Sequence, residues 1–383
     1  SFWPIVSSAR VIAGLETLPW ACRLVSQGSE CEILGTKTEV DVAIAAHPNG
    51  ISSSSSGVKG HIPRALDILQ AVVGHAPRLR LASGFLGVTL MNINSLWHPT
   101  LMYHRWNEEL EDGWDGEKTF ETPPLFYEGA SDDVGVTVSA MSKEVANVCA
   151  TLRDRYGDNL LDDLSSCRDA HDWFTRAYGH ESEIDRTSVA TMLRTNPAYQ
   201  GLTHPMKKLV QYDDSGSAIP DAKPRLVPDF HHRYLSEDIP YGLVVTRGIA
   251  ELAGVPTPTI DAVIMWAQKV QGLSYLTAAK PGGHSFSESD LNGDDVARSR
   301  CPQRYGWFDL DWFVRGNGYV VGESEGGANL EEASVGGEIR WSPGNAQAHL
   351  MKESHSTEGI TTTTSEEGGP CCADDYPAST RAA

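Results

Sequence analysis

Apolar side chains recur at helical spacing through the middle of the chain. After Ser142 they occupy one face of a helix as far as Gly157, and after Thr259 they follow the same spacing as far as Gly272. Ser and Thr are frequent helix N-caps, and Gly is a frequent terminator. The pattern therefore predicts one helix from Ser142 to Gly157 and another from Thr259 to Gly272.

Two further stretches are predicted to be helical from their composition and their ends. Residues 79–97 are apolar enough to form a central, mostly buried helix, and Pro99 is expected to end it. Residues 239–253 run into Gly254 and Pro256, which together form a stop signal.

Strand signals are confined to the start of the chain. Residues 10–25 and 31–46 contain short runs rich in β-branched side chains, and in the second run Val40, Val42 and Ile44 alternate with other residues. Because successive side chains of a strand point to opposite faces, this alternation predicts a strand with one apolar face.

Loops and a tail interrupt these patterns. Beyond residue 322 the chain is rich in glycine and acidic residues, and such composition predicts disorder, whereas residues 307–321 are apolar enough to dock. Polar, Gly-rich and Pro-rich stretches predict loops at 47–60, 212–226 and 278–294. The sequence thus predicts a mixed α/β part at 1–78, a mainly helical body at 79–306 and a tail at 307–383.

Charge and cysteine content narrow the class of protein. The 383 residues carry a formal net charge of −20, which disfavours binding to nucleic acid, and no apolar run is long enough to span a membrane. The seven cysteines are scattered and form no CxxC motif, which indicates a reducing compartment. We therefore expect a cytoplasmic protein without nucleic-acid or membrane partners.

Two groups of polar residues are candidates for chemistry. His98 ends the apolar stretch, and Asn94 lies one turn earlier on the same face. Arg233 lies five residues before Asp238, at the predicted start of the helix that contains Pro240. Arg can bind both oxygens of a carboxylate, and Asp can hold a histidine in one tautomer. The alternatives are a core histidine, a helix-capping Asp and an Arg in a surface ion pair.

Other signals are weaker. No HExxH motif or ordered carboxylate spacing accompanies the histidines, so no metal is predicted; they are His98, His104, His231 and His232. The glycines between 316 and 322 lack the strand and helix that would make them a dinucleotide loop.

Seven segments, taken in order, closely resemble the opine dehydrogenases of marine invertebrates, the octopine and tauropine dehydrogenase group. They are ETLPWACR (16–23), ILGTK (33–37), WHP with RW (97–99, 105–106), PLFYEG (124–129), GLTHP (201–205), RYLSEDIPYG (233–242) and RCPQRYG (300–306). The resemblance covers about residues 16–306.

This resemblance implies a reaction and a site. Family members condense a 2-oxo acid, usually pyruvate, with an amino compound and reduce the imine with NADH. The resemblance implies a Rossmann domain, of which residues 1–78 would be a remnant, followed by an all-helical domain. It makes His98 the catalytic acid/base and Asp238 its partner. Substrate-binding roles are implied for Arg233, Asn94, Glu16, Thr17 and Trp173, and the protein is expected to be a monomer or a weak homodimer.

The chain also departs from the family. No glycine-rich strand–turn–helix precedes residue 16, so we expect the NADH site to be incomplete in this chain, with its cofactor-binding residues unknown. Two alternatives follow: a non-catalytic fragment of such an enzyme, or another reductase with a helical substrate domain, of the ketopantoate or glycerol-3-phosphate type. Those reductases use lysine as the key acid. The amino substrate is not indicated by the sequence.

Overall fold

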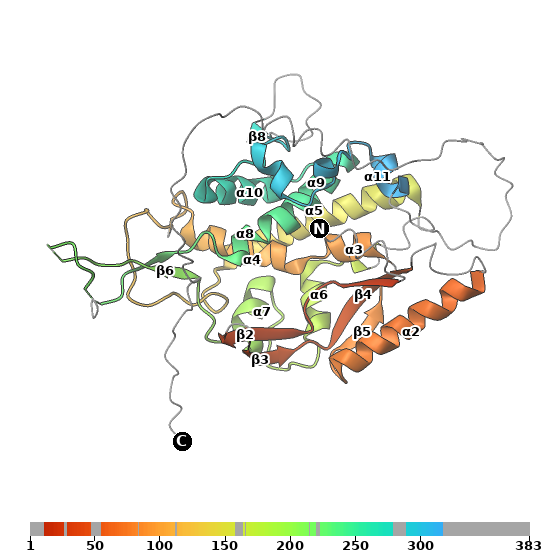
Figure 1. Ribbon diagram of the computed structural model, residues 1–383, viewed down its shortest axis with the longest axis horizontal. Helices are drawn as coiled ribbons and strands as arrows, with labels where there is room; N and C mark the ends of the chain where they lie inside the picture. The colour runs from red at the N-terminus through yellow and green to blue at the C-terminus, as the bar shows by residue number, and fades with distance from the viewer. Residues whose placement is uncertain are drawn as a thin grey trace, which may run out of the picture. The chain divides into compact units, whose positions relative to one another are not determined.

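The computed structural model describes most of the chain up to residue 316 (Figure 1). The described residues are 11–26, 29–46, 55–82, 84–111, 113–157, 164, 166–213, 215–219, 223–278 and 289–316. The expected disorder beyond residue 322 lies outside them. Apart from residues 24–31, the described residues belong to one compact unit.

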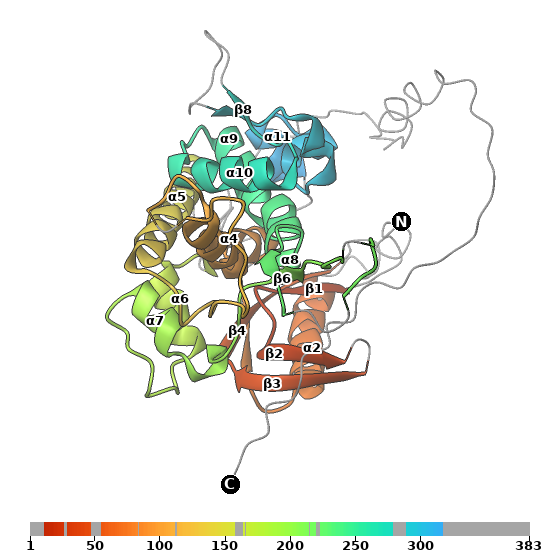
Figure 2. The ribbon, with the colours of Figure 1, turned by 90° about the vertical axis from the view of Figure 1, so that its left-hand side faces the viewer.

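The first part of the chain is α/β, as predicted. Strand β4 (Glu39–Ala46) pairs antiparallel with β1 (Val11–Leu15) and parallel with β5 (Arg78–Leu81), and helix α2 (Ser55–Val73) lies between β4 and β5 in the chain. Strands β2 (Trp20–Ser26) and β3 (Glu30–Thr36) pair separately. The two views of the ribbon show α2 alongside β4 and β5 (Figure 2).

The alternation in β4 has the predicted consequence. Its side chains Val40, Val42 and Ile44 are buried in a small core together with Leu79 of β5 and apolar residues of α2. The intervening Asp41 is also buried, at 3% exposure. Strand β4 therefore has buried side chains on both faces, and only one of those faces is fully apolar.

The helix predicted at 79–97 is wrong in its limits. Residues 78–81 form β5, a short helix α3 (Phe85–Leu90) follows, and α4 then extends from Ile93 to Trp106 with Pro99 inside it. An internal proline costs a helix roughly 3 kcal/mol. Here most of α4 from Ile93 to Met102 is buried, so packing on the helix outweighs that cost.

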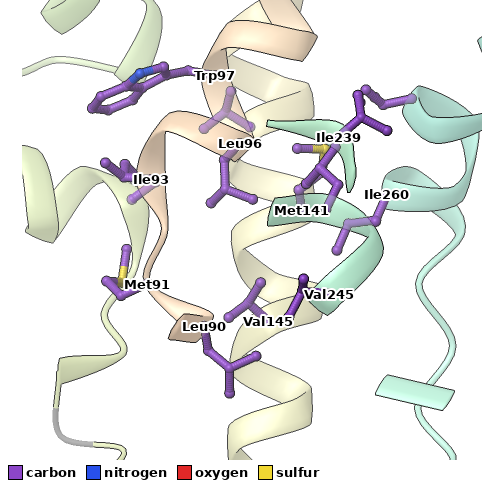
Figure 3. Packing of buried hydrophobic residues seen from close by; sticks show 14 of the residues in the cluster. Leu90, Met91, Ile93, Leu96, Trp97, Met141, Val145, Ile239, Val245 and Ile260 are labelled. Atoms are coloured by element: carbon purple, nitrogen blue, oxygen red, sulfur yellow. The ribbon is translucent and has the colours of Figure 1, made fainter. Parts of the chain in front are cut away.

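The helical part of the chain surrounds a large apolar core. Its central helix, α5 (Asp132–Tyr156), contacts α4, α7 (Val189–Thr195), α9 (Val244–Ala253) and α10 (Pro258–Gln271). Figure 3 shows Leu96 of α4 directed toward α5, where Met141 and Val145 face Ile239 and Val245. This core fixes α4 and the segment around residue 239 against each other.

The predicted helix ends are confirmed and the predicted starts are displaced. Helix α5 ends at Gly157 and α10 at Gly272; both glycines have a positive φ, and Gly272 adopts the left-handed helical conformation. Helix α5, however, begins after Ser131, eleven residues before Ser142, and α10 begins after Thr257 rather than Thr259. Ser142 instead lies buried inside α5 and accepts a hydrogen bond from the backbone N–H of Ala170.

Shorter elements complete the described structure. Short strands also occur beyond residue 46, contrary to expectation. They pair antiparallel on either side of two of the predicted loops: β6 (Met206–Lys208) with β7 (Leu226–Pro228), and β8 (Thr277–Ala278) with β9 (Ser289–Asp290). The predicted loop at 47–60 gives way to α2 from Ser55. The remaining elements are α6 (Ala170–Ala177), η3 (Pro197–Tyr199), α8 (Arg233–Ser236), the π-helix η4 (Ile239–Leu243), η5 (Asp294–Arg298), η6 (Pro302–Tyr305) and α11 (Leu310–Gly316).

The end of the described chain docks as predicted, because Leu310 and Val314 of α11 are each 3% exposed in the main core. Among the described helices, none combines the length and the apolar character that crossing a bilayer requires.

Candidate active site

His98 and Asp238 form a hydrogen-bonded pair, as the sequence predicted. The distance from His98 Nδ1 to Asp238 Oδ2 is 2.8 Å, although 140 residues separate them in the chain. His98 lies in the middle of α4, and Asp238 immediately precedes the π-helix η4. The Asp238 side chain makes no cap hydrogen bond to that helix, which disfavours the alternative of a capping residue.

Two tyrosines complete the surroundings of His98, and the sequence analysis missed both. The hydroxyl of Tyr127 lies 2.8 Å from His98 Nε2, and the Tyr234 ring stacks on the imidazole with 4.1 Å between ring centroids. Both tyrosines lie in segments that carried the family resemblance, which was the available signal. Their spacing along the chain gave no reason to connect them with His98.

The two hydrogen bonds define how the imidazole is held. Asp238 accepts a hydrogen bond from the Nδ1–H group, so the neutral ring has its free lone pair on Nε2. Burial raises the pKa of Tyr127 well above its usual range, so its hydroxyl stays protonated and donates to Nε2. A protonated His98 would instead donate from Nε2 to the Tyr127 oxygen. His98 can therefore gain or lose a proton at Nε2 without changing its position.

Arg233 and Asn94 lie at the border of this arrangement. The Arg233 guanidinium is exposed, with its central carbon 5.8 Å from the centre of the Tyr234 ring. The side chain of Asn94 is half-buried one turn before His98 on α4. A cation thus lies one ring away from the imidazole, where it can bind an anion.

Glu16 belongs to a second, ionic cluster. Its Oε1 lies 2.9 Å from Nη2 of Arg176 and accepts a hydrogen bond from the backbone N–H of Asp41. Nη1 of Arg176 lies 2.7 Å from Oδ1 of Asp41, and Arg168 lies 3.5 Å from the other oxygen of Asp41. Glu16 is the residue after β1 and Asp41 lies in β4, whereas Arg176 lies in α6. The cluster therefore joins the α/β part to the helical part.

The Glu16 carboxylate keeps one oxygen without a hydrogen bond. Burial raises the pKa of Glu16, and the backbone N–H of Asp41, Arg176 and the nearby indole of Trp173 oppose that shift. Among the described atoms, neither Glu16 Oε2 nor the Trp173 N–H meets hydrogen-bond geometry with a partner. Both atoms lie below the surface, and the indole is close enough to the Glu16 carboxylate to lower its pKa.

Trp173 is more deeply buried than a substrate contact requires. Its side chain has no exposed surface and packs edge-on against Trp97, with ring centroids 5.4 Å apart. Trp97 directly precedes His98, so this contact links the two clusters. A role for Trp173 toward the amino substrate stays a prediction.

The ammonium of Lys37, which the sequence analysis missed, lies against the segment around Thr17. Thr17 is half-buried, and the next residue, Leu18, accepts a hydrogen bond of 2.7 Å from the ammonium of Lys37. Burial lowers the pKa of Lys37 to about 8. Lys37 lies in the ILGTK segment and thus places a cation near Glu16.

The histidines do not converge on a metal site. Where the structure describes the chain, it shows no group of three or more His, Cys, Asp or Glu arranged to hold an ion. His104 lies 2.8 Å from the Thr137 hydroxyl, away from the His98 pair.

Comparison with known proteins gives consistent matches. Residues 81–271 match the family model of the NAD/NADP octopine/nopaline dehydrogenase α-helical domain, and this range contains His98, Tyr127, Arg233 and Asp238. The chain is 36% identical to the tauropine dehydrogenase of Arabella iricolor over 310 residues, 81% of this chain and 67% of that protein. It is 35% identical to the octopine dehydrogenase of Pecten maximus over 312 residues, 81% of this chain and 66% of that protein.

Solved structures give the same result. The structure of octopine dehydrogenase with NADH and L-arginine matches with a TM-score of 0.60 and 33% identity, covering 83% of this chain and 66% of that one. The complex with NADH and agmatine matches with a TM-score of 0.61 and 32% identity, with the same coverage. The chain thus spans about two thirds of the length of these relatives.

Proposed function

This chain belongs to the opine dehydrogenase family, and from that premise we propose that the protein condenses a 2-oxo acid with an amino compound and reduces the product with NADH. The observation that carries the proposal is the imidazole of His98, held through both ring nitrogens beside an exposed arginine. Condensation removes the oxo oxygen as water, and a positioned proton donor favours that loss.

The described residues suit the binding and proton-transfer parts of this reaction. Arg233 would hold the carboxylate of the oxo acid, because its guanidinium is exposed next to the ring that stacks on His98. His98 would supply the proton at Nε2, while Asp238 stabilises the charged ring. The substrate would take the place of the Tyr127 hydroxyl at Nε2 or receive the proton through it.

The amino substrate would enter from the side of Glu16. Glu16 lies 2.9 Å from Arg176 and beside the indole of Trp173, so an amino substrate would have to displace one of these contacts to reach the carboxylate. Asn94 and Thr17 are half-buried and would line the same path. Octopine dehydrogenase has been solved in complex with L-arginine and with agmatine, and another relative is a tauropine dehydrogenase, so a guanidinium and a sulfonate are both candidates.

The described residues do not form a complete binding site for NADH. A dinucleotide needs backbone N–H groups at the start of a helix after a glycine-rich turn, and the residues between β4 and the long helix α2 lie outside the described part of the chain. The parallel unit β4–α2–β5 supports residues 1–78 as part of a Rossmann domain. The roles assigned here are therefore confined to binding and proton transfer.

Turnover of the protein expressed from its complete reading frame tests the proposal. NADH oxidation is followed with pyruvate and a panel of L-arginine, taurine, glycine and L-alanine. His98→Ala should lower kcat about a hundred- to ten-thousand-fold, and Arg233→Ala should mainly raise KM for pyruvate. His104→Ala, on the same helix, and Arg225→Ala, also exposed, are the matched controls. Absence of oxidation with every amine, or an unchanged His98→Ala enzyme, contradicts the proposal.

A further inference from the structure

Two cysteines of the helical part, neither of them assigned above to the reaction, lie on neighbouring segments. Cys149 is buried in α5, with 1% exposure, and Cys167 is half-buried shortly before α6. Both are free thiols. The Sγ of Cys167 donates to the backbone oxygen of Gly87 in α3 at 3.3 Å. This bond holds the more accessible of the two thiols in a defined position.

The chain before α6 is fixed along one face of α5 at two points. Ser142, Cys149 and Arg153 are spaced seven and four residues apart, so their side chains lie on the same face of that helix. At one end of the face, Nη2 of Arg153 donates to the backbone oxygen of Leu164 at 2.7 Å. At the other end, the Ser142 hydroxyl accepts a hydrogen bond of 2.9 Å from the backbone N–H of Ala170. The two segments therefore run antiparallel, with Cys149 between the two points.

This alignment brings the two thiols together. Cys167 lies midway in the chain between Leu164 and Ala170, the two residues held by α5, and so faces Cys149. A hydrogen bond with the Cys167 thiol lowers the pKa of Cys149; burial opposes this shift, and the charge of Arg153 adds to it. The pair thus combines a half-buried thiol with a buried partner in hydrogen-bond contact. In such a pair, a sulfenic acid on the first thiol can condense with the second.

We propose that Cys167 and Cys149 form a redox modification site, which hydrogen peroxide converts to a disulfide. The Cys167 sulfur attacks one peroxide oxygen, the O–O bond breaks, and the departing oxygen leaves as water with the thiol proton. The Cys149 sulfur then attacks the sulfenic acid on Cys167, the S–S bond forms, and the sulfenic oxygen leaves as a second water with the proton of Cys149. Two thiols are oxidised and one peroxide is reduced to two waters. The new bond joins α5 to the segment that leads into α6.

Peptide mapping of the whole chain after oxidation tests the site. Trypsin leaves Cys149 in the peptide 144–153 and Cys167 in the peptide 156–168, with one cysteine in each. The folded protein is treated with hydrogen peroxide, the remaining thiols are alkylated, and the digest is analysed by mass spectrometry. The two peptides should appear linked, lighter than their sum by two hydrogens, and dithiothreitol should separate them. The link should be the main disulfide product of the folded chain.

Two variants distinguish a paired site from general thiol oxidation. Cys149→Ala removes the second thiol, so Cys167 should proceed to the sulfinic acid, which wild type avoids by forming the disulfide. Cys31→Ser removes an exposed cysteine of β3 and is the matched control. It should leave the yield of the linked peptides within about twofold of wild type, because oxidation depends on the local surroundings of each thiol.

Three results would overturn the proposal. The first is sulfinic acid on Cys167 of wild type while Cys149 is still alkylated. The second is a Cys167 linked mainly to some other cysteine. The third is an equal yield of the linked peptides when the chain is unfolded in guanidinium before oxidation, since the folded geometry would then contribute nothing. Because no NADH or turnover enters the mapping, its failure is separate from a failure of the proposed function.

Discussion

At the scale of single residues, neighbouring side chains hold the His98 imidazole at both ring nitrogens and on one face. Asp238 holds one ring nitrogen, Tyr127 the other, and Tyr234 covers one face of the ring. Tyr127 is itself stacked on Tyr199, with 4.1 Å between ring centroids. The position of Nε2 is therefore fixed by aromatic packing as much as by hydrogen bonds.

Removing the Tyr127 hydroxyl should reveal its role at Nε2. Tyr127→Phe keeps the stacked ring and should lower kcat about tenfold, the effect of one lost hydrogen bond of ordinary strength. Tyr199→Phe is the matched control, since the hydroxyl of Tyr199 bonds to that of Tyr178 and not to His98. Turnover at several pH values measures both. Equal losses in the two variants would assign Tyr127 a packing role only.

The buried His204 should make the fold sensitive to acid. It is 2% exposed and accepts a hydrogen bond from the indole of Trp106, and burial lowers its pKa to about 3. An unfolded histidine binds a proton near pH 6.5, so stability is lost as pH falls from about 6.5 toward 3, by up to roughly 5 kcal/mol. Urea unfolding should show a weaker pH dependence in His204→Gln than in wild type. The exposed His75→Gln should keep the wild-type slope.

At the scale of elements, one carboxylate anchors two helices. Glu144 of α5 accepts hydrogen bonds from the backbone N–H groups of Thr259 and Ile260, at 2.7 and 3.0 Å, in the first turn of α10. Those groups have no partner within their own helix. Glu144 thus fixes the start of α10 against the middle of α5.

Loss of this anchor should be costly. Glu144→Ala leaves buried donors unsatisfied and should lower the free energy of unfolding by about 2–4 kcal/mol, and Glu144→Gln by less, because its amide oxygen still accepts. The neighbouring exposed Lys143→Ala should stay within about 0.5 kcal/mol of wild type. Chemical denaturation measures all three. A small loss in Glu144→Ala would mean that water replaces the carboxylate.

At the scale of the whole molecule, a network of buried charged side chains connects the α/β part to the helical part. Arg176 of α6 binds Glu16 and Asp41 of the α/β part, and both acidic side chains are almost fully buried. Close packing accompanies it: a Cβ on Gly35 of β3 would lie 2.5 Å from that of Ala198. The α/β part and the helical part are thus held together by a charge network and by the close approach of the Gly35 backbone to the Ala198 side chain.

Breaking the network should weaken this connection. Arg176→Ala leaves the buried carboxylate of Glu16 without its cation and leaves Asp41 with Arg168 alone, and it should destabilise the protein by about 3–5 kcal/mol, with partial recovery in Arg176→Lys. Arg155→Ala breaks the half-exposed pair with Asp311 and should cost less than about 1 kcal/mol. Denaturant unfolding followed by tryptophan fluorescence distinguishes these cases. If Arg176→Ala matches Arg155→Ala, the network contributes little to stability.

The sequence by itself determined the local features. Alternation placed Val40, Val42 and Ile44 on one face of β4, Gly157 and Gly272 ended their helices, and Pro240 marked the first turn of η4. These features depend on the backbone preferences of one residue and its near neighbours, so they can be read without knowing the fold. Ordered motifs added the family and, through it, the pairing of His98 with Asp238.

Only the tertiary structure decided the rest. Helix α5 starts before Ser142 and includes Gly135, although glycine is unfavourable inside a helix. A Cβ at position 135 would lie 2.9 Å from the backbone of Ala190, so the packing of α5 on α7 requires a glycine there. Helix α4 continues through Pro99 because its two ends are buried in one core. Tyr127 and Arg176 acquire their roles from partners 29 to 160 positions away in the chain. Contacts of that range depend on how the helices pack, which no local pattern encodes.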